Sequence, residues 1–152
     1  RKNFERCKLN FSERTTHSEY YDLHKDLMRL RKEDSRFQKQ IPGGVDGAVL
    51  GAKSFLLRYF GERNDERLVV VNFGTPQPLI PCPEPLLAPP FGFEWDVIWS
   101  SDDPRYGGPG ITKPFGDEGW SLPGESTIAL RAIPQTRPRR KPKERHAPKA
   151  KQ

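Results

Sequence analysis

Residues 55–73 read FLLRYF, GERNDER and LVVVNF, two six-residue runs rich in aromatic and β-branched residues around a polar connection. This pattern predicts a β-hairpin. The second run carries apolar side chains on both faces around residues 69–71, which is typical of a central strand. Arg58 interrupts the apolar face of the first run, so that run is expected to leave one side in water. A sheet buried on both faces needs another layer, which the rest of the chain must supply.

The composition favours one small domain with short strands and many turns. The chain has 152 residues, a hydrophobic fraction of 34%, 16 prolines and 13 glycines. Its net charge of +6 belongs to a tail, because residues 134–152 hold eight Lys or Arg against one Glu. We expect this basic tail to be disordered. Binding to nucleic acid through residues 137–151 is the less favoured alternative, because the tail has no aromatic residue on which bases could stack.

The sequence predicts neither a membrane segment nor a metal or cofactor site. No run of about 18 apolar residues exists, and residues 1–10 lack the apolar core of a signal peptide, so we expect a cytoplasmic protein. Cys7 and Cys82 lie far apart without CxxC spacing or a histidine cluster, which favours two free thiols. His17 and His24 are expected to have packing or surface roles, because no nucleophile or carboxylate pair is spaced to meet them.

One helix is predicted near the N-terminus. Thr16 and Glu19 have the spacing of a capping box, so the helix is expected to run from Thr16 to about Glu33. Asp26 belongs to its polar face. An apolar stripe repeats at three- and four-residue steps on the other face. The stripe consists of Tyr20, Leu23, Leu27 and Leu30.

Short strands follow at close spacing after the break at residues 41–44, IPGG. Seven prolines in residues 76–90 place that segment at a sheet edge or on the surface, with its leucines at the rim of the sandwich. Residues 93–100 and 126–133 alternate as half-buried strands, and we expect them to form the layer that covers the hairpin. The first of these strands is expected to show Phe93, Trp95, Val97 and Trp99 on one face.

The predicted fold class is therefore mainly β. No helical pattern separates the strands, which excludes a parallel sheet with helices on both faces. An antiparallel Greek-key β-sandwich at residues 45–133, preceded by one α-helix, is what remains.

The candidate ligand site is a cluster of aromatic and acidic residues, which could form a carbohydrate platform because sugars bind on aromatic faces beside carboxylates. The favoured interpretation is that the tryptophans are core and that the Asp102-Asp103-Pro104 turn caps its own backbone. Asp102 and Asp103 are adjacent and point apart, so no catalytic carboxylate pair is predicted. The cluster consists of Trp95, Trp99, Asp102, Asp103, Arg105 and Tyr106.

Several motifs over residues 3–133 together resemble the C-terminal end of the maltooligosyltrehalose trehalohydrolases, a family of the α-amylase clan. The resemblance implies that residues 1–40 are the last loop and last helix of a catalytic (β/α)8 barrel, and that residues 45–133 are the β-sandwich that follows. The basic tail at residues 134–152 matches nothing in that family. The motifs are FERCKLN, HSEYYDLHKDLMRLRKED, DGAVLG, LLRYFGE, RLVVVNFG, PEPLLAPP, WDVIWSSDDPRYGGPG and STIALR.

The same resemblance implies a function. The family hydrolyses the α-1,4 bond next to the terminal trehalose unit of maltooligosyl trehalose, with acidic residues at the strand ends of the barrel. This chain is then expected to be a catalytically inactive fragment, with the barrel as its partner in cis and no catalytic residue of its own. Three alternatives stay open: a stand-alone module that binds maltooligosaccharide through Trp95, Trp99 or Tyr106, the C-terminal domain of a glucan-branching or other clan enzyme, and a dimer formed through the helix stripe.

Overall fold

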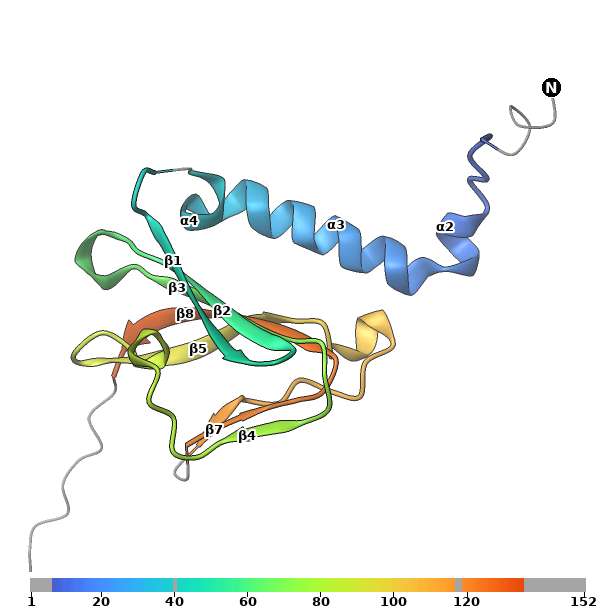
Figure 1. The fold of residues 1–152 in the computed structure, drawn as a ribbon. Helices are drawn as coiled ribbons and strands as arrows, with labels where there is room; N and C mark the ends of the chain where they lie inside the picture. The colour runs from blue at the N-terminus through green and yellow to red at the C-terminus, as the bar shows by residue number, and fades with distance from the viewer. Residues whose placement is uncertain (1–6, 40, 117–118, 136–152) are drawn as a thin grey trace, which may run out of the picture.

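The predicted hairpin lies in the middle of a five-stranded antiparallel sheet (Figure 1). The computed structural model describes residues 7–39, 41–116 and 119–135. A second, three-stranded antiparallel sheet packs against one face of the first. The first sheet has the order β1 (Val45–Gly51), β2 (Ser54–Tyr59), β3 (Arg67–Asn72), β8 (Ser126–Pro134) and β5 (Phe93–Ser100). The second has the order β4 (Gln77–Leu79), β7 (Gly119–Leu122) and β6 (Phe115–Gly116). The predicted antiparallel β-sandwich is confirmed.

The hydrophobic core lies between the two sheets. β2 and β3 pair without interruption from Ser54 opposite Asn72 to Tyr59 opposite Arg67, and β3 lies between β2 and β8, which confirms it as a central strand. Each fully buried leucine or isoleucine contributes about 1.5–3 kcal/mol to folding. The core residues, each at most 4% exposed, are Leu56, Leu68, Val70, Leu87, Trp95, Leu122, Ile128 and Leu130.

Arg58 lies inside the sandwich, so the expectation that β2 leaves this side in water is wrong. Its Nε donates to Glu66 Oε2 at 2.7 Å, and its Nη1 donates to the carbonyls of Leu86 and Ala88 at 3.0 and 2.7 Å. Trp95 lies under the guanidinium at 5.5 Å. The arginine is tolerated there because its donors are satisfied by a carboxylate and by carbonyls of the proline-rich segment.

The layer that covers the hairpin differs from the predicted one. β5 and β8 belong to the same sheet as the hairpin, because β8 pairs with β3 and β5 pairs with β8. The cover comes from β4, β7, β6 and the 3₁₀ helix η2 (Pro85–Leu87), which brings Leu87 into the core. Alternation alone marks which face of a strand is apolar, but it does not say which strand is its neighbour.

A bulge in β5 separates two tryptophans that the sequence places on one face. Val97 pairs with Leu130, whereas Trp99 pairs with Ala129, so Ile98 is an extra residue in β5. Trp95 therefore points into the core, and Trp99 points to the outer face of the five-stranded sheet. The alternation expected for β8 is confirmed, since Ile128 and Leu130 lie in the core.

Among the residues that the structure describes before the strands, three segments are helical: α2 (Glu13–Thr16), α3 (Ser18–Glu33) and α4 (Ser35–Gln38). The predicted capping box is wrong. Thr16 ends α2, where its hydroxyl donates to the carbonyl of Ser12 at 3.3 Å, and His17 occupies the N-cap of α3 without a side-chain hydrogen bond. The predicted end at Glu33 is confirmed. Figure 1 shows α3 over the outer face of the five-stranded sheet, opposite the second sheet.

Cys7 and Cys82 are free, as expected, the first exposed and the second half-buried. Of the helices in the described part of the chain, none has the length and apolar character needed to span a bilayer. The predicted disorder of the basic tail at residues 134–152 concerns a segment of which all but the first two residues lie outside the described residues.

Candidate functional site

The turn after β5 has a fixed shape that positions two side chains toward α3. Asp103 caps the 3₁₀ helix η3 (Pro104–Tyr106) by accepting a hydrogen bond from the backbone N–H of Arg105 at 2.9 Å. Gly107 follows at φ +80°, and a Cβ on Gly108 would lie 2.3 Å from the backbone of Asp102. The predicted self-capping of this turn is confirmed, and it places Arg105 and Tyr106 beside the helix.

Asp26 connects α3 to this turn. The hydroxyl of Tyr106 donates to Asp26 Oδ2 at 2.6 Å, and Nη1 of Arg105 donates to the same oxygen at 2.9 Å. Arg29, one turn along the helix, pairs with the other carboxylate oxygen at 3.0 Å. Trp99 completes the group through a hydrogen bond from its Nε1 to the hydroxyl of Tyr106 at 3.3 Å. We call Asp26, Arg105 and Tyr106 the helix anchor.

The electrostatics of the anchor favour an ionised Asp26. The hydrogen bond from Tyr106 lowers the pKa of Asp26 below its usual 3.8, and the positive charges of Arg29 and Arg105 lower it further, against the opposing effect of burial. Burial raises the pKa of Tyr106, and its hydrogen bond to Asp26 raises it further. At neutral pH the hydroxyl of Tyr106 therefore keeps its proton, and the ionised carboxylate of Asp26 accepts a hydrogen bond from it.

A second polar cluster fixes the C-terminal end of α3. Asp34, the C-cap residue of α3, accepts a hydrogen bond from Nε of Arg67 at 2.7 Å. Arg67 also donates to Asp65 at 2.6 Å, and Asp65 accepts from Arg36 of α4 at 2.9 Å. Burial alone would raise the pKa of Asp65, but the hydrogen bonds from Arg67 and Arg36 outweigh it and hold that pKa below its usual value. Two polar contacts thus position the helix over the sheet.

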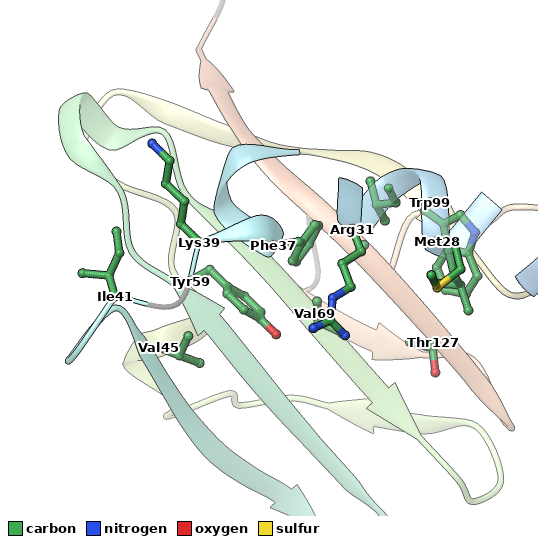
Figure 2. Close-up of a pocket in the computed structure, with 13 residues that line it drawn as sticks. Met28, Arg31, Phe37, Lys39, Ile41, Val45, Tyr59, Val69, Trp99 and Thr127 are labelled. Atoms are coloured by element: carbon green, nitrogen blue, oxygen red, sulfur yellow. The ribbon is translucent and has the colours of Figure 1, made fainter. Parts of the chain in front are cut away.

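An open apolar groove of about 650 Å³ lies between α3, α4 and the outer face of the five-stranded sheet (Figure 2). All five strands contribute to its floor. The aromatic ring of Phe37 from α4 meets Tyr59 edge-on at 5.0 Å and closes one part of it. The floor residues are Val45, Tyr59, Val69, Thr127, Ala129 and Trp99, and the helical wall includes Leu27, Met28, Leu30 and Arg31.

The apolar stripe of α3 is only partly used for packing on the sandwich. Leu23 and Leu30 are half-buried, whereas Tyr20 is 63% exposed and Leu27 is 37% exposed. Met28 beside them is 67% exposed. The helix therefore presents an apolar strip that continues the groove away from the sheet.

The six residues of the predicted cluster do not form a sugar platform. Trp95 lies in the core on the other face of the sheet, with its Nε1 donating to the carbonyl of Leu87 at 2.8 Å. Tyr106 is 8% exposed and bound to Asp26, and Asp103 is bound to Arg105 at 2.8 Å. Asp102 is buried. Trp99 is the cluster member that lines the groove, which is otherwise mostly aliphatic.

Sequence reasoning missed the anchoring residues of the helix. The sequence pattern predicts Asp26 on the polar face, yet it is the buried residue of α3. The pattern could not show this, because the partners that bury it, Arg105 and Tyr106, lie about 80 positions away in the chain. Asp34 and Arg67 likewise pair across 33 positions. A local pattern carries no signal for such pairs.

The described residues contain no group of three or more His, Cys, Asp or Glu side chains that could hold a metal ion. No curated protein and no solved structure matches the chain. The family described as "Domain of unknown function (DUF3459)" matches residues 42–130, more than half of the chain, from just before β1 into β8. The chain therefore belongs to the DUF3459 family, a C-terminal accessory domain found in α-amylase-family glycoside hydrolases.

Proposed function

We propose that this chain is the C-terminal accessory region of a glycosidase that releases trehalose from maltooligosyl trehalose, and that it braces the catalytic barrel instead of acting on substrate. The observation that carries the bracing role is the use of the polar residues of the turn. Arg105 and Tyr106 bind Asp26 and so hold α3 in place, and the groove of about 650 Å³ under that helix is lined mainly by apolar side chains. An apolar concave face suits a protein neighbour better than a sugar.

The assignment to trehalose release rests on the resemblance of residues 3–133 to the trehalohydrolases. In this proposal residues 1–40 are the last loop and helix of the barrel, with α3 as that helix, and residues 45–133 are the accessory sandwich. The anchor then joins the two parts: Asp26 belongs to the barrel side, and Arg105 and Tyr106 belong to the sandwich side. A rigid connection at this point would hold the last barrel helix in place.

A stand-alone module that binds maltooligosaccharide is the second candidate, and Trp99 is the residue that favours it. This side chain is half-buried and lines the groove. Sugar platforms combine an aromatic face with polar groups that bind hydroxyls. The hydroxyl of Tyr106, which accepts a hydrogen bond from Trp99, is itself bound to Asp26, so this pair offers Trp99 little support as a sugar site.

The test is the product formed by the intact gene product that carries this sequence. With maltotriosyl trehalose as substrate, we expect free trehalose and the shortened maltooligosaccharide. Branched glucan as the product, or a gene product without a catalytic barrel, would overturn the assignment. The 152-residue chain alone should release no trehalose, and maltoheptaose should not quench its tryptophan fluorescence saturably. Saturable quenching that Trp99→Ala abolishes would favour the binding module instead.

A further inference from the structure

β1 is a free edge of the five-stranded sheet. It pairs with β2 on one side, and on its other side no further strand follows in the described part of the chain. The opposite edge, β5, is interrupted by the bulge at Ile98, which makes it a poor template for an added strand. β1 pairs regularly from Val45 to Val49 and contains no proline or basic residue. A regular edge of this kind can pair with a second copy unless something prevents it.

The hydrogen-bonding pattern shows which backbone groups of β1 face outward. The N–H of Phe60 donates to the carbonyl of Gly44 at 2.9 Å, so these two residues form a hydrogen-bonded pair. In an antiparallel ladder such pairs recur at every second residue, which directs the backbone groups of Asp46 and Ala48 toward β2. The residues that alternate with them direct their N–H and C=O groups away from β2. These outward-facing residues are Val45, Gly47 and Val49.

The outward-facing residues match those of a second copy. An antiparallel pair centred on Gly47 places this glycine opposite itself, and Val45 opposite Val49 of the other copy. The two valines share one face of the sheet, where they are 47% and 80% exposed. Cross-strand pairs of β-branched residues stabilise a sheet. The edge is therefore self-complementary in both its backbone and its apolar side chains.

Asp46 interferes with this pairing at its centre. Within β1 it is the one charged residue, and its Oδ1 accepts a hydrogen bond from the N–H of Gly47 at 2.8 Å. That N–H would be the central donor of the pair, so the carboxylate competes directly with the incoming strand. In the paired register the two Asp46 side chains would also lie on one face, about 7–8 Å apart on a diagonal, where like charges repel each other.

We propose that the carboxylate of Asp46 keeps the β1 edge from pairing with a second copy of the chain. Its hydrogen bond occupies the central donor at Gly47, and its negative charge opposes the Asp46 of the other copy. This role goes beyond the proposed function, because it does not depend on the reaction of the enzyme that carries the sandwich.

The test compares the self-association of the full chain with that of Asp46→Ala by sedimentation equilibrium. We expect the dimer dissociation constant to fall roughly a hundredfold, about tenfold for the carboxylate lost from each copy. Asp22→Ala is the matched control, because it removes the same charge from an exposed position on α3, and it should associate like the wild type. Amide hydrogen exchange at Val45, Gly47 and Val49 should slow in the Asp46→Ala dimer. The urea midpoint of the Asp46→Ala monomer should match that of the wild type, which separates edge pairing from unfolding.

A second variant tests where the two copies meet. Adding Val49→Lys to Asp46→Ala places a charge in the apolar cross-strand pair and should restore the monomer. The proposal would be overturned by an Asp46→Ala chain that stays monomeric, by a wild type that already pairs through β1, or by a dimer that survives Val49→Lys. Equal association of Asp22→Ala and Asp46→Ala would also overturn it, because the effect would then come from net charge and not from the edge.

Discussion

The two faces of the five-stranded sheet are built in different ways. The inner face is closed by apolar packing, with Leu56, Leu68 and Leu130 fully buried against the second sheet and η2. The outer face is covered by α3, which is held by two polar contacts, at Asp26 and at Asp34, with an open groove between helix and strands. Packing without gaps makes a stable unit, whereas polar contacts at two points hold an element in place and leave surface for a neighbour. We infer that the inner face maintains the fold, whereas the outer face depends on the two polar contacts that hold α3.

The largest effect is expected from breaking the buried pair of the inner face. Arg58→Met removes the partner of Glu66, which is itself 9% exposed, and leaves a carboxylate without its cation. We expect a loss of about 3–5 kcal/mol in the free energy of unfolding, measured by urea denaturation. The double variant Arg58→Met with Glu66→Gln should recover part of this loss. A single variant as stable as the wild type would show that the inner face does not depend on this pair.

A cavity in the inner face is expected to cost slightly less. Leu130→Ala removes a side chain with no exposed surface, and such substitutions reduce the free energy of unfolding by about 2–5 kcal/mol. Val49→Ala on the edge strand β1 is the matched control, because Val49 is 80% exposed, and it should change stability by at most about 0.5 kcal/mol. Equal losses for the two variants would contradict the contrast between packed core and open surface.

Breaking the helix anchor should have a local effect. Asp26→Asn weakens the hydrogen bonds from Tyr106 and Arg105, and hydrogen bonds to a charged group contribute about 1.5–3 kcal/mol. Amide hydrogen exchange in α3 should become roughly ten- to a hundredfold faster, since about 1.4 kcal/mol corresponds to a factor of ten, with β3 and β8 unchanged. Asp22→Asn, exposed on the same helix, should leave exchange unaltered. A uniform increase across helix and sheet would show that α3 and the sandwich unfold as one unit.

The smallest effect is the pH dependence of the same anchor. The pKa of Asp26 is lowered in the folded state, so its contribution is present above the unfolded value near 3.8 and is lost as pH falls through the lower folded value. Exchange protection in α3 should stay level from pH 7 to about 5, once corrected for the intrinsic rate, and should fall below about 3.8. Asp26→Asn should flatten this dependence in α3. Protection that decreases between pH 7 and 5 would contradict the assignment of this dependence to Asp26.

The inner face was largely predictable from the sequence. The hairpin of β2 and β3 and the apolar face of β8 follow from period-two alternation, which each strand carries in its own residues. The neighbours of β5 and β8 were not predictable, because strand order depends on contacts between distant residues. The bulge at Ile98 was also not predictable, because the residues of the strand carry no local mark of it. The extra residue turns Trp99 to the opposite face of the sheet.

The outer face was harder to predict. The helix pattern located α3 and its end at Glu33, but it assigned Asp26 to the solvent because a carboxylate usually belongs there. Its burial depends on Arg105 and Tyr106, which reach it from a turn shaped by Asp103 and the following glycines. The groove is lined by residues of the helix and of all five strands, so the pattern of no single segment predicts it.

Gly108 is not part of the helix anchor, yet the position of α3 depends on it. The backbone of Asp102 occupies the space that any side chain at position 108 would need, so a substitution there must shift the turn. The shift would carry Arg105 and Tyr106 with it, and these two residues hold Asp26. A mutation of this single glycine would therefore displace a helix about 80 positions earlier in the chain. We expect few substitutions to be tolerated in this turn.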